Sequence, residues 1–263
     1  MNEYITKKRT IIFSPNYNKL INNDYITKES TIIFSPNYNK LIEIDLLNLY
    51  NKIIFSDYPL IDDLILKYSN NYFNCIDYIG SNFNKQIEFP PNIVHLTFGK
   101  CFNQFIKLPT SITHLTFGQY FNKSIKLPTN VVNLTFGVFF NQPIEIPPNV
   151  VSLTFGFSFN QPIKLPHNIV YLTFGQSFNQ KVDFPFNIKY LKLQNDKAHN
   201  LDYLPEGIEV LELGRTFSSS LDNLPNSLLA IKLYNNYQGS LKCLPGKTKV
   251  IIKKIGKKIF VGK

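Results

Sequence analysis

Hydrophobic and polar positions alternate in short blocks along most of this chain. In one block, residues 94–98, Leu96 and Phe98 fall on one side of an extended chain, and His95 and Thr97 fall on the other. This period of two predicts a short β-strand with one buried face. Similar blocks follow at regular intervals, so the block is the unit from which the fold is built.

The rest of each block is expected to return to the start of the next without a helix. Gly99 follows the strand, marks a sharp turn and is expected to need the positive φ that glycine tolerates. Phe102 should point inward, and Ile106 and Leu108 form a second apolar pair before a corner at Pro109. This half is short and lacks the helical period, which argues against a helix.

Three sequence markers recur in phase. Glycines recur at a constant interval from Gly80 through Gly99 to Gly175, and a Phe-Asn pair recurs with the same spacing. One such unit cannot bury its apolar side alone. We therefore predict a repeat solenoid, mainly β, with a parallel sheet on one face and irregular returns. The third marker is proline, with the same interval over the first six members and a slightly longer one afterwards: Pro90, Pro109, Pro128, Pro147, Pro166, Pro185, Pro205, Pro225 and Pro245.

An asparagine follows each recurring phenylalanine. A side-chain amide both donates and accepts hydrogen bonds, so it can satisfy backbone groups of the turn and bond to the next coil. We expect these residues to form a structural ladder and not a ligand site. They are Asn84, Asn103, Asn122, Asn141, Asn160 and Asn179.

Two runs carry a family resemblance. Residues 134–144 (LTFGVFFNQPI) and 153–163 (LTFGFSFNQPI) resemble FNIP repeats. That family is a short relative of leucine-rich repeats, expanded in social amoebae and in large DNA viruses that infect amoebae. The likeness is specific from about Phe83 to Gln180 and looser from there to Leu244. The resemblance implies a right-handed, curved leucine-rich-type coil that mediates protein–protein interaction, frequently behind an N-terminal F-box, with no catalytic residues.

The N-terminal part departs from the repeat. Residues 2–21 and 23–42 are a nearly identical tandem duplicate, which represents either two copies of a binding motif or a duplication without special chemistry. Further on, the pattern predicts two helices. Asp45 can cap residues 46–54, and Pro59 can open a second helix. This helical pair is interpreted as a cap on the first coil, with a degenerate F-box as the alternative.

The predicted organisation has four parts: a duplicated segment (1–44), a helical cap (45–75), the solenoid (76–245) and a basic cap or tail (246–263). The last part holds seven lysines and no acid, and so carries most of the net charge of +10. It is interpreted as a final strand whose lysines guard an exposed sheet edge. A contact with acidic lipid or nucleic acid is the alternative, although the nearly neutral remainder argues against a nucleic-acid groove.

No catalytic, metal or cofactor site is expected, and the chain is not predicted to be an enzyme. Cys75, Cys101 and Cys243 give neither a disulfide framework nor a zinc spacing. The start has no secretory signal pattern, and no apolar run approaches the length of a membrane span. We therefore expect an intracellular, cytoplasmic location, which would be the host cytoplasm for a viral protein.

The expected function is a protein–protein interaction scaffold that binds an unidentified partner on the exposed strand face. The alternatives are a ubiquitin-ligase substrate adaptor with ligase components as partners, and nucleic-acid or membrane binding through the tail. Tyr171 and Tyr190 should be neighbours, as an anchor for a partner or simply packed together. The candidate partner-binding residues are His95, Thr97, His114, Thr116, Asn133, Tyr171, Tyr190 and Lys192.

Overall fold

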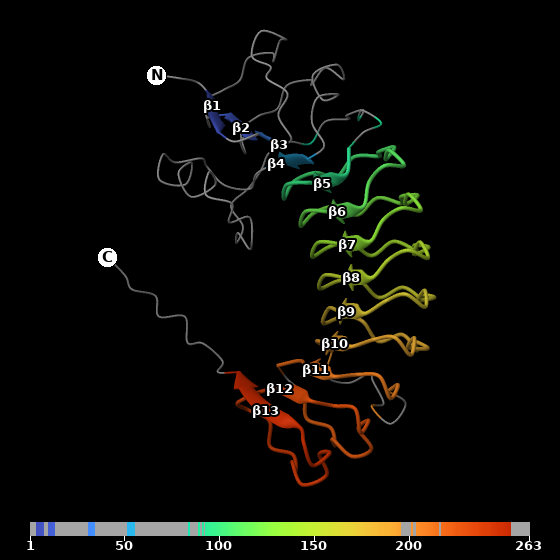
Figure 1. Cartoon of the computed structure of the whole chain (residues 1–263), viewed down its shortest axis with the longest axis vertical. Coiled ribbons are helices and arrows are strands. Elements are labelled where there is room, and N and C mark those ends of the chain that lie inside the picture. The colour runs from blue at the N-terminus through green and yellow to red at the C-terminus, as the bar shows by residue number, and fades with distance from the viewer. Residues whose placement is uncertain are drawn as a thin grey trace, which may run out of the picture. The chain divides into compact units, whose positions relative to one another are not determined.

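The computed structural model describes most of the repeat region and the backbone of four earlier strands. The described residues are 4–7, 10–13, 31–34, 52–55, 84, 89, 91, 93–195, 201, 204–215 and 217–253. The chain divides into two compact units, residues 1–150 and 151–263, and each is described by itself. In both, short strands from successive coils lie side by side (Figure 1).

The first unit contains a sheet that is parallel apart from its first strand. β1 runs antiparallel to β2, and from β2 onward each described pair of neighbouring strands is parallel. The strands are β1 (Tyr4–Lys7), β2 (Thr10–Phe13), β3 (Thr31–Phe34), β4 (Lys52–Phe55), β5 (His95–Thr97), β6 (His114–Thr116) and β7 (Asn133–Thr135).

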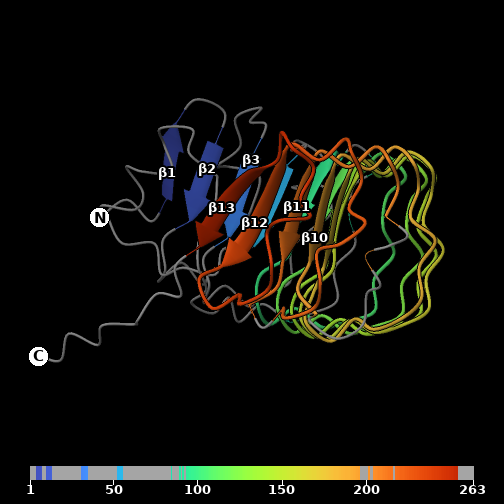
Figure 2. The same cartoon turned by 90° about the horizontal axis from the view of Figure 1, so that it is seen from below.

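The second unit has the same design, and its strands lengthen from three residues in β8 to five in β12 and β13. All its described strand pairs are parallel and follow the order of the chain. Seen along the stack, the strands line one side and the returning segments close the other (Figure 2). The strands are β8 (Ser152–Thr154), β9 (Tyr171–Phe174), β10 (Tyr190–Leu193), β11 (Val210–Leu213), β12 (Ala230–Tyr234) and β13 (Lys249–Lys253). The predicted parallel sheet of stacked coils is confirmed.

One prediction about the N-terminal part is wrong. Residues 52–55 form β4 and not the end of a helix over 46–54. The reason is a third copy of a short motif: Ile-Ile-Phe-Ser occurs at 11–14, 32–35 and 53–56, at equal spacing. β-Branched pairs favour a pleated sheet, so the third copy also forms a strand. The rest of the expected cap lies outside the described residues.

Stacked phenylalanines fill the core. In the first unit, Phe117 lies between Phe98 and Phe136 with ring centroids 5.3 Å apart on each side. Within one coil, Phe117 also stacks on Phe121 at 4.0 Å. All four rings are buried. Because each ring contacts the rings above, below and beside it, no coil can bury its apolar side without its neighbours.

The predicted asparagine ladder is confirmed. In the first unit, Asn122 Oδ1 accepts a hydrogen bond from the backbone N–H of Asn141 at 2.9 Å, and Asn103 Oδ1 accepts one from Asn122 N at 3.0 Å. In the second unit, Asn160 Oδ1 accepts from Asn179 N at 3.0 Å. These side chains are exposed or half-buried, so the ladder runs along the outer edge of the turns. They serve the coil, as expected.

The recurring glycines have a different purpose from the one predicted. No described glycine has a positive φ, so the expectation for Gly99 and its counterparts is wrong. The coils instead approach so closely that no side chain fits. A Cβ on Gly137 would lie 2.5 Å from the carbonyl carbon of Gly118 and 2.9 Å from the Cα of Gln119. Both contacts are far shorter than packed atoms permit.

The basic C-terminal segment begins as the predicted strand. β13 pairs in parallel with β12 along its whole length, with Ala230 opposite Lys249 and Tyr234 opposite Lys253. Residues 254–263 lie outside the described part of the chain. A final strand in the basic segment 246–263 is thus present at residues 249–253, whereas the guarding of an exposed sheet edge by its lysines stays a prediction.

Candidate functional site

The exposed strand face of the first unit carries five of the predicted residues. His95 and His114 are cross-strand neighbours, and their imidazole rings stack with centroids 4.1 Å apart and planes only 7° from parallel. Asn133 lies next to His114 in the same register. Thr113 Oγ1 and His114 Nδ1 form a hydrogen bond of 2.8 Å. The structure brings these residues together, and in the described part of the chain no three His, Cys, Asp or Glu residues form a metal site.

The two candidate threonines follow the histidines in the same register, two positions along each strand. Thr97 is paired with Thr116 across β5 and β6. Both are half-buried, and each lies beside an inward-facing leucine or phenylalanine. The result is a row of small hydroxyl side chains, which suits the surface of a sheet.

The strand face of the second unit is more varied. Tyr171 on β9 and Tyr190 on β10 are neighbours, as predicted, with ring centroids 6.4 Å apart and planes inclined by 38°. Tyr171 exposes 53% of its surface. Tyr190 is half-buried, and its hydroxyl donates a hydrogen bond of 2.9 Å to Glu212 Oε2. The two tyrosines therefore differ: Tyr171 is available to a partner, whereas Tyr190 is held in place by the coil.

Glu212 on β11 is a buried carboxylate, only 2% exposed, at the centre of this face. Its Oε1 accepts from Lys192 Nζ at 2.9 Å and from Lys253 Nζ at 2.7 Å. Lys232 Nζ lies 3.8 Å from Oε2 and 5.2 Å from the ring centroid of Tyr190. A carboxylate is stable in such a place only when it is paired and hydrogen-bonded, and here four groups from three other strands do so.

These contacts set the charge state of the cluster. Burial by itself raises the pKa of Glu212, but hydrogen bonds from Lys253, Lys192 and Tyr190 outweigh it and lower that pKa from 4.5 to about 2. Burial and the bond to Glu212 raise the pKa of the Tyr190 hydroxyl above its usual value of 10. At neutral pH, Glu212 is therefore ionised and Tyr190 is protonated.

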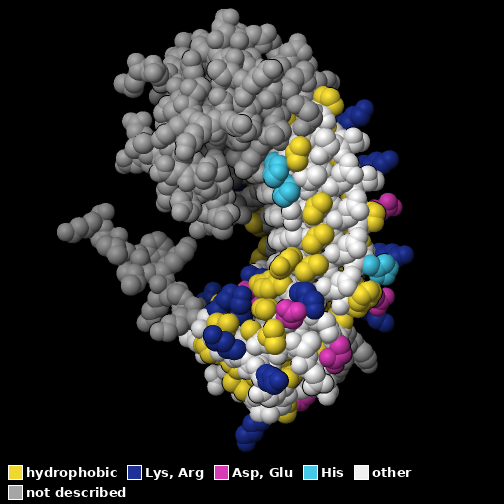
Figure 3. All heavy atoms as spheres, viewed as in Figure 1, with side chains coloured by type: hydrophobic (Ala, Val, Ile, Leu, Met, Phe, Trp, Pro, Cys, Tyr) yellow, Lys and Arg dark blue, Asp and Glu magenta, His cyan; other side chains and the backbone are white. Residues whose placement is uncertain are grey.

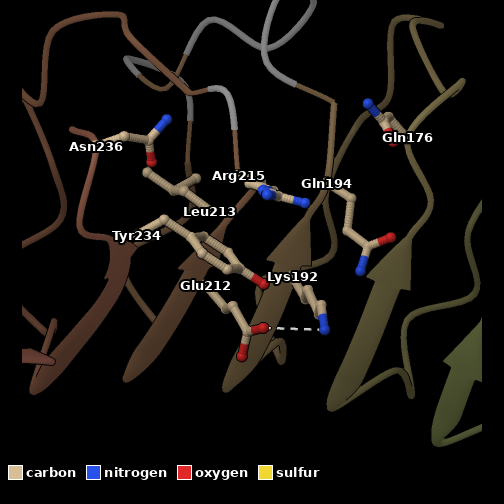
Figure 4. Close-up of a pocket in the computed structure, with 9 residues that line it drawn as sticks. Gln176, Lys192, Gln194, Glu212, Leu213, Arg215, Tyr234 and Asn236 are labelled. Atoms are coloured by element: carbon tan, nitrogen blue, oxygen red, sulfur yellow. Dashed lines mark ion pairs between the residues drawn. The ribbon is translucent and has the colours of Figure 1, made fainter. Parts of the chain in front are cut away.

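A pocket of about 560 Å³ opens beside Glu212 on the same face (Figure 4). Residues from β10 to β12 and from the turns that follow β9 to β12 line it, and Arg215 lies between Tyr234 and Gln194. Figure 3 shows basic and hydrophobic side chains gathered on this surface of the second unit. The polar lining consists, besides Glu212, of Gln176, Lys192, Gln194, Arg215, Tyr234 and Asn236.

Sequence reasoning found only the edge of this site. Lys192 and Tyr190 were among its candidates, whereas Glu212, Arg215 and Lys253 were not. The signal for Glu212 was present, because Lys192, Glu212 and Lys232 follow one another at equal spacing and so share a register. Lys253 gave no such signal: it lies two positions further along its strand than the residue in register with Glu212, and it reaches Glu212 across β12.

Comparison with known proteins agrees with this architecture. The FNIP Repeat family model matches residues 83–120, 102–139, 121–158, 140–177 and 159–196. No curated protein matches the chain. In the described residues there is no helix long and apolar enough to cross a membrane.

A solved structure is also similar to the chain. It is described as the crystal structure of CroV588, a novel circular LRR protein structure. The two share 29% sequence identity with a TM-score of 0.64, over 95% of this chain and 44% of that one. The chain thus spans less than half the length of CroV588, and the likeness supports a leucine-rich-type coil.

Proposed function

Because residues 83–196 are tandem FNIP repeats in a leucine-rich-type solenoid, we propose that the chain is a non-enzymatic scaffold that binds a protein partner on the strand face of its second unit. Such solenoids expose a broad surface and typically act in protein interaction. The proposal concerns the face formed by β9 to β12.

One observation carries the choice of this face: the buried core positions repeat from coil to coil, whereas the outward position at the start of each strand varies. The core phenylalanines recur in every FNIP coil, whereas the outward position changes from Ser152 to Tyr171, Tyr190, Val210 and Ala230. A structural ladder requires the same residue in every coil, whereas the recognition of one particular partner requires a surface that differs from coil to coil. An exposed tyrosine beside a charged pocket is typical of an interface anchor.

The alternative functions have less support. Lys253, in the basic C-terminal segment, is engaged with Glu212 and helps to complete the last coil, which favours a structural role for at least this part of the segment over membrane or nucleic-acid contact. The proposed F-box residues lie outside the described part of the chain, apart from β4. Among the residues that the structure describes, no specific contact favours the ubiquitin-ligase adaptor over a plain scaffold.

A matched pair of substitutions tests the strand face. Tyr171→Asp places a charge in the middle of the proposed interface, at a side chain that is 53% exposed. Phe157→Asp makes the same change at a side chain that is 50% exposed, in the turn after β8. We expect Tyr171→Asp to lower capture of the partner at least about tenfold, because hot-spot aromatics carry most of the affinity, and Phe157→Asp to leave it unchanged.

The measurement is quantitative affinity purification from the cell that makes the protein, with the two variants and the wild type side by side. Unchanged circular dichroism should accompany both substitutions. If every captured protein is retained by Tyr171→Asp, the strand-face proposal fails. Tyr190 and Lys192 are unsuitable for this test, because both support the buried carboxylate of Glu212.

A further inference from the structure

We propose that the pocket beside Glu212 receives a carboxylate side chain from an acidic, extended peptide segment of the partner. This inference rests on the proposed function and specifies the chemistry of the partner. It follows from the hydrogen-bonding capacity, the charge and the surroundings of the pocket.

The pocket offers hydrogen-bond donors that the protein itself does not use. Within the part of the chain that the structure describes, the guanidinium of Arg215 and the side-chain amides of Gln176 and Gln194 make no hydrogen bond or ion pair. Arg215 is exposed at the pocket, and its planar fork matches a carboxylate with two parallel N–H···O bonds. These groups favour an oxyanion as the ligand.

Glu212 does not cancel this preference, because its carboxylate is already fully engaged. Oε1 accepts from two lysines, and Oε2 accepts from Tyr190 and lies near Lys232. A carboxylate has about four lone-pair sites; here it accepts hydrogen bonds from Lys253, Lys192 and Tyr190, and Lys232 adds an ion pair at 3.8 Å. Three lysines therefore surround this single negative charge and Arg215 lines the same pocket, so the excess positive charge attracts an anion.

The surroundings favour a peptide over a free anion. The pocket is about 560 Å³, which lies within the range of pockets that enclose larger ligands and far exceeds the need of one carboxylate. Two positions away along the strands, on the same face, runs a mostly uncharged row that contains Tyr171, Tyr190, Val210 and Ala230 and ends at Lys249. The cationic and apolar rows run parallel across the strands. An extended chain has side chains that alternate in direction, so acidic and apolar residues in alternation fit both rows.

Nucleic acid fits this surface less well. Its backbone would place regularly spaced phosphates along a groove lined by basic side chains. Here Lys192, Lys232 and Lys253 converge on Glu212 instead of forming a line. Lys189, which precedes β10, does not extend this group into a row of free cations, because it is paired with Glu209 at 3.0 Å. A single acidic side chain next to an apolar one matches a convergent site better than a row of phosphates does.

The test selects a ligand without assuming its identity. A random dodecapeptide library displayed on phage is panned on the full chain, and the selected peptides are then synthesised with a fluorescent label for anisotropy titration. We expect enrichment of Asp or Glu next to aromatic or aliphatic residues. Changing the acidic residue to its amide in the peptide should weaken binding at least about tenfold, because charge-assisted hydrogen bonds are lost.

Two protein variants complete the experiment. Arg215→Gln should weaken binding of the acidic peptide at least about tenfold, whereas Lys164→Gln, the same charge change at an exposed residue of a returning segment, should alter it less than about twofold. The pocket proposal would fail, and the strand-face proposal would hold, for one combination of results. In it, the selected peptides show no preference for acidic residues, and their binding is lost in Tyr171→Asp but unchanged in Arg215→Gln. Peptides whose binding is unchanged by both Tyr171→Asp and Arg215→Gln, or a labelled oligouridylate that binds more tightly than any peptide, would overturn both proposals.

Discussion

Gly175→Ala is expected to destabilise the second unit by about 3 kcal/mol or more, because the new methyl group would be forced into the backbone of the preceding coil. A Cβ at this position would lie 2.5 Å from the carbonyl carbon of Gly156 and 2.8 Å from the Cα of Phe157. Both are backbone atoms held in register by the parallel ladder, so they cannot move aside as a flexible side chain would. The measurement is the free energy of unfolding in urea.

Gly246→Ala is the matched control for this substitution. It lies in the same unit, and a Cβ there would have no atom within 4 Å. Its φ is not positive, so alanine is expected to be neutral or slightly stabilising, by up to about 1 kcal/mol. Equal effects of the two substitutions would show that glycine is used for chain flexibility and not for close approach of the coils.

Glu212→Gln is expected to cost about 3 kcal/mol at pH 7, because it leaves lysine ammonium groups crowded together without their counter-charge. The neutral amide keeps the size of the side chain, so packing is unaffected. Glu209→Gln provides the control: Glu209 pairs with Lys189 at 3.0 Å, but the side chains are 43% and 49% exposed. An exposed pair of this kind contributes less than about 1 kcal/mol.

The same pair of variants predicts a pH dependence. The pKa of Glu212 is lowered from 4.5 to about 2 in the folded protein, so its contribution is present above pH 4.5 and is lost as the pH falls towards 2. The stability difference between wild type and Glu212→Gln should therefore shrink by about 3 kcal/mol over this range. Urea titrations at several pH values measure it. A difference that does not change with pH would contradict the ionised, lysine-paired state of Glu212.

The coil could be predicted because its signals are local and repeated. Phe98, Phe117 and Phe136 stack because they occupy the same position in successive coils, and a fixed spacing in the sequence becomes a fixed position in the stack. The asparagine ladder follows from the same regularity. The helix expected over residues 46–54 is wrong, because that expectation gave more weight to a capping residue and an apolar run than to the recurrence of Ile-Ile-Phe-Ser. The recurrence predicts the observed strand.

The site could be predicted only in part, because it depends on which side chains of different coils meet. Lys192, Glu212 and Lys232 share a register and could be aligned by counting residues. Lys253 could not, since its contact with Glu212 is distant in the sequence and passes over an intervening strand. The burial of Glu212 could not be predicted from the sequence either. The alternation of the strand places this residue on the outward face, where only the side chains of neighbouring strands cover it.

The most direct test of the account is to ask which face touches the partner in the cell. A photoreactive benzoylphenylalanine is placed at Tyr171 in one version of the chain and at Phe157 in another, where the two natural side chains are about equally exposed. After irradiation, cross-linked protein is purified and identified by mass spectrometry. The account predicts a discrete cross-linked partner from position 171 and none from position 157. The same adduct from position 157, with none from position 171, would contradict it.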